Sequence, residues 1–106
     1  MKKDQDSFNI LVNIDKDKNA SQRQLANNLG FSLGKLNYLL NELIKKGLIK
    51  IERFKRNEKK LKYVYILTPE GISKRSKLAI NFMKRKMVEY ETLKKEISKF
   101  KKGTIK

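Results

Sequence analysis

The stretch from residue 21 to residue 43, SQRQLANNLGFSLGKLNYLLNEL, constrains this chain most, because it predicts two short helices joined by a tight turn. Ser21 followed three residues later by Gln24 has the spacing of a capping box, which marks the start of a helix. Gly30 readily takes the left-handed conformation that ends a helix. Between these residues lies an apolar stripe at helical spacing, formed by Leu25, Ala26 and Leu29.

A second helix is predicted over residues 32–46, with Ser32 as its capping residue and Gly47 at its end. Phe31 can fill the gap beneath the turn. At about 100° per residue, the apolar residues share one side of this helix: Leu33, Leu36, Leu39, Leu40, Leu43 and Ile44. The opposite side carries Gly34, Tyr38, Asn41 and Lys45. The helix therefore has one face to bury and one face that can contact another molecule.

The chain is strongly basic, with 27 Lys and Arg against 11 Asp and Glu among 106 residues and a net charge of +16. Residues 1–31 hold five basic and four acidic side chains, residues 32–62 hold ten and three, and residues 63–106 hold twelve and four. The excess begins at the second helix, which a general abundance of lysine does not explain. A polyanion is the natural partner of such a surface.

Composition excludes several classes of site. The sequence contains no cysteine and no histidine, which removes disulfides, cysteine or histidine catalysis and the usual zinc sites. We therefore expect no cofactor, no metal and no enzymatic activity. No apolar run approaches the roughly 20 residues of a membrane span, and the N-terminus MKKDQDSF lacks a signal-peptide core. We expect a cytoplasmic protein that does not bind membranes.

The remaining sequence predicts another helix and a β-hairpin. Residues 4–17 begin with capping candidates and continue with apolar residues at helical spacing, and Asn19 with Ala20 could add a short edge strand. Apolar residues then alternate with polar ones after residue 48 and again over residues 61–67, with the polar segment KRNEKK between. Residues 53–62 hold six basic side chains and one acidic one. This pattern predicts a hairpin with a basic tip.

The C-terminal third predicts one long helix. Thr68 and Pro69 suit the cap and the first position of a helix, and nothing stops the helix before Gly103. At 1.5 Å per residue such a helix spans on the order of 50 Å, too long to pack wholly on a domain of this size. We expect its distal part to form a dimer; the alternative is a frayed basic tail. The apolar seam consists of Met83, Met87, Tyr90, Leu93, Ile97 and Phe100.

Seven residues at fixed offsets resemble the helix-turn-helix of DNA-binding proteins: Leu25, Ala26, Leu29, Gly30, Phe31, Leu36 and Leu39. An ordinary pair of antiparallel helices is the alternative. The β-hairpin that follows the helix-turn-helix corresponds to the wing of a winged-helix domain. The order of Leu48-Ile49, the basic turn and YVYILTPEG resembles the winged-helix domains of the MarR family of bacterial regulators, in which a piece such as LTPEG leads from the last strand into a helix.

The stretches FSLGKLNYLLNELIKKGLIKI, YILTPEGI and NFMKRKMVEYETLKKEI are similar to a short branch of this family that is associated with exopolysaccharide (EPS) gene clusters. Typical members are longer at both ends and often hold an effector. The resemblance implies a mainly α fold with a small β-hairpin (α+β), in which a winged helix-turn-helix domain at residues 1–68 precedes a long dimerisation helix at residues 69–106. Whether a small-molecule effector exists stays open.

In this interpretation two copies each place helix 32–46 in a major groove of double-stranded DNA, with the hairpin against adjacent backbone or minor groove. Candidates for reading bases or lining the groove are Ser32, Gly34, Lys35, Asn37, Tyr38 and Asn41. Candidates for phosphate or minor-groove contacts are Arg53, Lys55, Arg56, Lys59 and Lys60. Tyr38 could instead pack on the domain, and Asn41 could be an ordinary solvated residue.

We therefore predict a sequence-specific transcriptional regulator that acts as a homodimeric repressor on an inverted-repeat operator, although the sequence does not fix the sign of regulation. Two other functions stay open. One is a sequence-indifferent architectural DNA-binding protein, which the charge alone would satisfy. The other is a winged helix that docks a protein partner.

Overall fold

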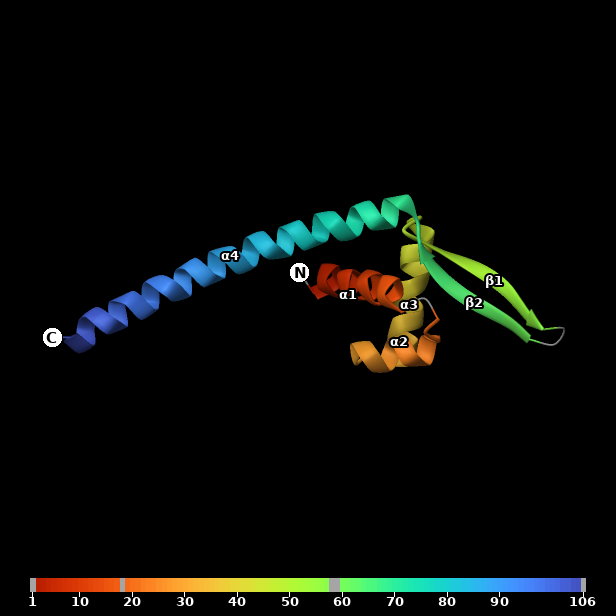
Figure 1. Cartoon of the computed structure of the whole chain (residues 1–106), viewed down its shortest axis with the longest axis horizontal. Helices are drawn as coiled ribbons and strands as arrows, with labels where there is room; N and C mark the ends of the chain where they lie inside the picture. Colours follow the sequence, from red (N-terminus) through yellow and green to blue (C-terminus); the bar gives the residue numbers. More distant parts are fainter. Residues whose placement is uncertain (1, 18, 58–59, 106) are drawn as a thin grey trace. The chain divides into compact units, whose positions relative to one another are not determined.

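The structure is a computed structural model that describes residues 2–17, 19–57 and 60–105, with the side chains of residues 3–17, 19–53 and 63–102. The chain divides into two compact units, Met1–Ser76 and Lys77–Lys106. The helices and the hairpin confirm the predicted mainly α fold (Figure 1). Their order is α1 (Lys2–Lys16), α2 (Gln22–Leu29), α3 (Leu33–Lys45), β1 (Ile49–Asn57), β2 (Lys60–Leu67) and α4 (Pro69–Ile105).

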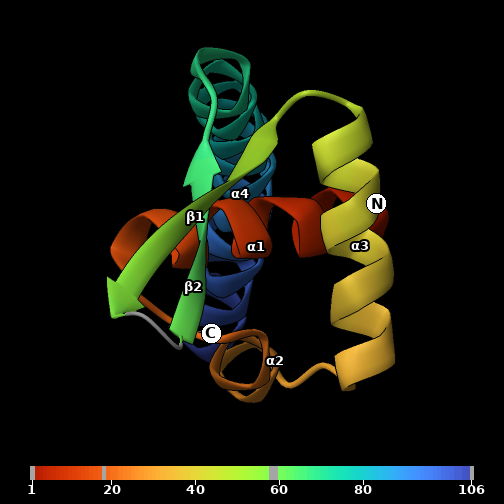
Figure 2. The ribbon, with the colours of Figure 1, turned by 90° about the vertical axis from the view of Figure 1, so that its right-hand side faces the viewer.

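The core of the first unit lies where α1, α2 and α3 meet the base of the hairpin. Figure 2 shows α1 passing behind the two strands toward α3, with α2 near the first turn of α3. All of these elements contribute to the core. Its most deeply buried side chains are Ile10, Leu11, Ile14, Leu25, Leu36, Leu40 and Ile49. Burying one aliphatic side chain of this size contributes about 1.5–3 kcal/mol, so these contacts fix the position of α3.

Capping residues begin α2 and form the turn between α2 and α3, as the sequence predicts. The Ser21 hydroxyl accepts a hydrogen bond from the Gln24 N–H at 3.1 Å, and the Gln24 side chain accepts one from the Ser21 N–H at 2.8 Å. Gly30 ends α2 with a φ of 70°, a conformation in which a side chain is strained. The Ser32 hydroxyl then accepts a hydrogen bond from the backbone N–H three residues later, and α3 begins.

The strands of the hairpin pair antiparallel, with Ile49 opposite Leu67 at the base and Asn57 opposite Lys60 near the tip. They run farther than expected, because the pairing takes in part of the polar segment KRNEKK. Ladder hydrogen bonds join backbone groups whatever the side chains are, so a polar stretch does not by itself end a strand. A register shift interrupts the pairing just before Asn57.

Three local expectations are wrong. The sheet of the described chain consists of β1 and β2, so Asn19 and Ala20 add no edge strand there, and Ala20 is buried in the core. Leu33 is 47% exposed, because it is the first residue of α3, one turn before Leu36, and lies beyond the side chains that cover the later turns. Gly103 does not end α4, since a glycine costs about 1 kcal/mol in a helix without preventing the next turn.

The start of α4 is held against the segment that leaves α3. The Thr68 N–H donates to the Leu48 carbonyl at 3.1 Å, and the Thr68 hydroxyl donates to the Gly47 carbonyl and accepts from the Gly71 N–H at 3.0 Å. Gly71 is buried, and a Cβ atom there would lie 2.0 Å from the Leu48 carbonyl oxygen. The glycine of LTPEG is therefore required by a close approach of two backbone segments.

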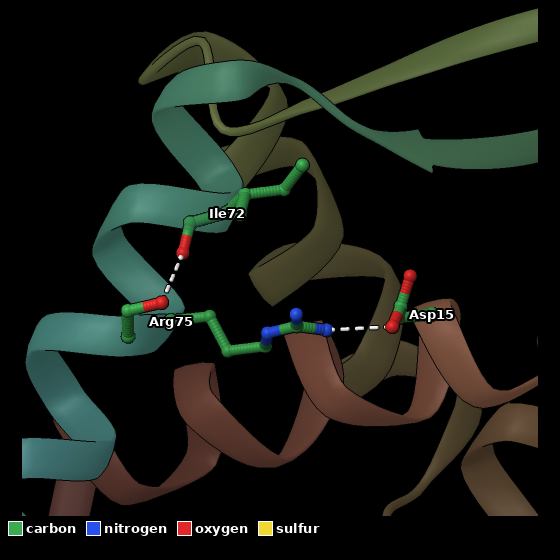
Figure 3. A network of polar contacts seen from close by, with 4 residues as sticks. Asp15, Ile72 and Arg75 are labelled. Carbon is green, nitrogen blue, oxygen red and sulfur yellow. Dashed lines mark hydrogen bonds and ion pairs between the residues drawn. The ribbon is translucent and has the colours of Figure 1, made fainter.

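An ion pair joins α1 to the first turns of α4. The Arg75 guanidinium lies 2.7 Å from the Asp15 carboxylate (Figure 3). On the same turns of α4, the Ser76 hydroxyl donates to the Ile72 carbonyl at 3.1 Å. An ion pair at the surface contributes at most about 1 kcal/mol, so this contact orients the start of α4 more than it stabilises the fold.

Candidate nucleic-acid interface

The solvent side of α3 carries all the residues of that helix predicted to contact DNA. Four leucines anchor its other side and are at most 7% exposed: Leu36, Leu39, Leu40 and Leu43. The predicted residues are all exposed and share one surface: Ser32, Gly34, Lys35, Asn37, Tyr38 and Asn41. Tyr38 is 60% exposed, so most of its side chain faces solvent. The structure thus brings these six candidates together.

Gly34 lies in the first turn of α3, with nothing within 4 Å of the position that a Cβ atom would take. Its φ is negative, unlike that of Gly30 or Gly47. Neither packing nor backbone conformation within the described chain therefore requires a glycine here. The helix nonetheless accepts a cost of about 1 kcal/mol relative to alanine. The backbone at Gly34 is open to close approach by another molecule.

Lys35 is held toward α1 at one edge of this surface. Its ammonium nitrogen lies 3.1 Å from a carboxylate oxygen of Asp6 and 4.2 Å from the centre of the Phe31 ring. Lys35 and Asp6 also line a shallow hollow between α1 and α3 with Lys3, Tyr38 and Leu39. A phosphate bound by Lys35 would compete with Asp6 for the ammonium group. Asn37 and Asn41 lie toward the other edge of the helix, at the angles expected from its period.

Two residues of this surface were not predicted. Leu33 is exposed beside Ser32 and could contact the methyl group of a thymine. Its position as the first residue of the predicted helix was the feature of the sequence that indicated its exposure. The contact of Asp6 with this surface could not be predicted from the sequence, because its partner Lys35 lies on a different helix far along the chain.

The hairpin contributes one described candidate, Arg53, which is exposed on β1. Its guanidinium lies 5.6 Å from the centre of the ring of Tyr63, the residue opposite it on β2. The other hairpin candidates lie outside the described side chains, and for one of them, Lys59, the backbone is outside the described residues as well. Roles for these residues stay predictions: Lys55, Arg56, Lys59 and Lys60.

The second unit carries the predicted dimerisation residues. All six are 55–71% exposed: Met83, Met87, Tyr90, Leu93, Ile97 and Phe100. A contiguous stripe of large apolar side chains in water marks an interaction surface. The described residues contain no group of three or more Asp or Glu side chains that could hold a metal ion. None of the described helices is long and apolar enough to cross a membrane.

Comparison with known proteins identifies the fold. Residues 7–50 match a family model described as winged helix-turn-helix DNA-binding. The structure is similar to that of MarR from Staphylococcus aureus in complex with salicylate and kanamycin, with 17% sequence identity and a TM-score of 0.65, over 81% of this chain and 56% of that chain. The chain has the winged helix-turn-helix fold of the MarR regulators.

Further structures share this MarR-type fold. The PcaV transcriptional regulator of Streptomyces coelicolor, in complex with its natural ligand, gives a TM-score of 0.67 at 17% identity, over 77% of this chain and 57% of that chain. A mutant of S. aureus MepR bound to an oligodeoxyribonucleotide gives 0.64 at 20% identity, over 90% of this chain and 75% of that chain.

The chain spans less than two thirds of the length of the MarR and PcaV chains. No curated protein matches its sequence. The family model that matches residues 7–50 is described as DNA-binding, and the fold is similar to that of MarR-type proteins.

Proposed function

We propose that this protein is a transcriptional regulator that binds double-stranded DNA sequence-specifically, as a homodimer on an inverted-repeat operator, and represses the genes it controls. The observation that carries the proposal is the exposed polar face of α3, open at Gly34 and backed by buried leucines. The winged helix-turn-helix match and the MarR-type fold support it. In the neighbouring MepR structure, this fold binds an oligodeoxyribonucleotide.

Binding follows from the chemistry of this face. In a major groove, an asparagine side chain can pair with adenine through two hydrogen bonds, which suits Asn37 and Asn41. Gly34 lets the backbone approach the DNA, and the Ser32 hydroxyl at the N-terminus of α3 can donate to a phosphate. The net charge of +16 draws the protein to the duplex whatever its sequence.

The proposed inverted-repeat operator follows from the proposed homodimer. The exposed seam of the second unit supports pairing of two copies, and a two-fold pair reads an inverted repeat with half-sites about one helical turn apart. A dimer bound over a promoter blocks polymerase, which is the basis of the proposed repression. The association with exopolysaccharide genes stays a prediction from sequence resemblance.

Selection of bound sequences from a random pool of duplexes tests the proposal. A palindromic consensus is the expected result. Binding without any consensus would instead indicate an architectural DNA-binding protein, and absence of binding would favour a winged helix that docks a protein partner. Either of these two results contradicts the proposal.

Transcription in vitro from a promoter that carries the selected site tests the sign of regulation. We expect the protein to lower transcription from this template and to leave a matched template with a scrambled site unchanged. An increase on the selected template would make the protein an activator.

A further inference from the structure

The apolar seam of α4 follows a strict heptad over its distal part. Tyr90, Leu93, Ile97 and Phe100 are spaced by three, four and three residues, and each is more than half exposed. Such spacing places them at alternate a and d positions of a heptad, with Tyr90 and Ile97 at a. Met83 lies one heptad before Tyr90 and takes the same position. The d position of that first heptad is Lys86, and Met87 falls at e, so the apolar a/d seam is complete from Tyr90 to Phe100.

The two flanks of this seam carry opposite charges. Glu89 and Glu96 each precede an a residue and therefore occupy g positions, whereas Lys94 and Lys101 each follow a d residue and occupy e positions. The Lys86 ammonium, which belongs to the d residue of the preceding heptad, lies 3.5 Å from the carboxylate of Glu89 at g. One edge of the seam is thus acidic and the other is basic.

We infer that α4 pairs with α4 of a second copy as a parallel, in-register coiled coil. In a parallel pair, each g residue faces the e residue five positions later on the other chain. Glu89 then faces the partner's Lys94, and Glu96 faces the partner's Lys101, twice by symmetry. An antiparallel pair brings g against g and e against e, which places glutamate near glutamate and lysine near lysine.

This charge pattern selects a second copy as the occupant, because one helix carries both halves of each ion pair. The inference rests on the homodimer of the proposed function and adds its direction. Because both α4 helices run the same way, both chains enter the coiled coil from the same end.

Cysteine cross-linking of the full chain tests the direction, since the sequence has no cysteine of its own. Leu93→Cys and Phe100→Cys, made separately, should both give disulfide-linked dimers on mild oxidation, measured on non-reducing gels. Lys95→Cys, on the outer side of the helix, is the matched control and should stay unlinked. In an antiparallel pair, sites about 10 Å apart along the helix cannot both lie at the two-fold axis. Cross-linking at only one of the two seam positions would therefore overturn the inference.

Charge reversal gives a second readout. Glu89→Lys with Glu96→Lys should weaken self-association roughly 10- to 100-fold in sedimentation equilibrium, because four attractive pairs become repulsive. Mixing this variant with the Lys94→Glu, Lys101→Glu variant should restore dimers, which shows that both variants fold. An unchanged dimer in the first variant indicates the antiparallel arrangement and contradicts the inference.

The outcomes separate this inference from the proposed function. A wild-type chain that is monomeric at high concentration overturns both the coiled coil and the homodimer, and the apolar seam of α4 would then bind another partner. The DNA selection still tests DNA binding in that case. A dimer with the antiparallel cross-linking pattern overturns only the direction proposed here.

Discussion

At the scale of single residues, one basic side chain on the surface of α3 is held by residues outside that helix. The Asp6 carboxylate and the Phe31 ring hold Lys35 at the edge toward α1. Tyr38 extends into solvent near the middle of the exposed face. We expect Lys35 to contribute mainly to phosphate contacts at the rim, and the residues nearer the centre of the face to contribute to base recognition.

Gly34→Ala separates folding from DNA binding. Because a Cβ atom at Gly34 meets nothing, the substitution should raise the free energy of unfolding by about 0.5–1 kcal/mol through the helix propensity of alanine. We expect affinity for the selected operator to fall at least about tenfold, since the methyl group occupies the space that the duplex needs. Thermal melting and a binding titration measure the two effects. Unchanged operator affinity in the stabilised variant would show that DNA does not approach the backbone here.

Asn37→Ala and Tyr38→Ala test sequence discrimination. One good contact to a base edge contributes about 1–3 kcal/mol, so each substitution should lower operator affinity roughly 10- to 100-fold and change affinity for scrambled DNA little. Titrations with both duplexes at one fixed salt concentration give the ratio. The melting temperature should stay close to wild type, because both side chains are exposed.

Leu36→Ala is the matched control for these two variants. Leu36 is completely buried, and its truncation should lower the free energy of unfolding by about 2–5 kcal/mol. If both surface variants fold normally and keep the wild-type ratio of affinities, α3 does not read bases through this face.

At the scale of elements, two glycines with opposite surroundings determine how the domain is assembled and what it can contact. Gly34 has open space beside it, whereas Gly71 lets the first turn of α4 approach the Leu48 carbonyl. Thr68 adds hydrogen bonds at the same junction. The end of the hairpin and the start of α4 are thereby fixed to the segment that follows α3.

Gly71→Ala should have the opposite effect on stability from Gly34→Ala. The added methyl group would lie 2.0 Å from a backbone oxygen, and the backbone must shift to make room. Such overpacking costs about 1–3 kcal/mol, which denaturant unfolding measures. A variant as stable as wild type would show that α4 does not begin in close contact with Leu48.

The hairpin is expected to supply affinity more than specificity. Replacing Arg56 and Lys59 by Ala should weaken binding to operator and to random DNA to a similar extent, because Lys and Arg bind phosphates whatever the base sequence. The slope of log affinity against log salt concentration should decrease by about one unit for each lost phosphate contact. Weakening of the operator complex alone would mean that the hairpin reads sequence or groove shape.

At the scale of the whole molecule, charge and apolar surface divide between two tasks. The basic excess begins at α3 and continues to the end of the chain. The exposed apolar seam lies in the second unit. Under the proposed function, the basic surface binds DNA and the apolar seam binds a second copy of the chain.

Leu93→Lys combined with Ile97→Lys should produce monomers in analytical ultracentrifugation, because two like charges on each helix would face each other across the seam. Monomers should also bind an inverted repeat more weakly than dimers do, since each half-site is then bound separately. Val88→Lys, a surface control outside the seam, should leave the dimer intact. Dimers of wild-type strength in the double variant would place the interface elsewhere.

Much of this fold was predictable from sequence because its signals are local. Ser21 with Gln24, Gly30 and Ser32 marked the ends of α2 and α3. The change of apolar period after residue 48 predicted the hairpin. The extent of the strands was not predictable, because backbone pairing continues through polar residues. Which of the candidate residues bind DNA stays a prediction.

The sequence by itself determined the order and type of the helices and the hairpin and most of the composition of their faces, since caps, glycine conformations and apolar periods act between residues a few positions apart. Tertiary structure alone decided which distant groups meet. It brought Asp6 to Lys35, placed Gly71 against Leu48 and left Leu33 exposed at the end of a helix. These contacts depend on how helices and strands pack in three dimensions, and no pattern along the chain encodes a distance between residues on different elements.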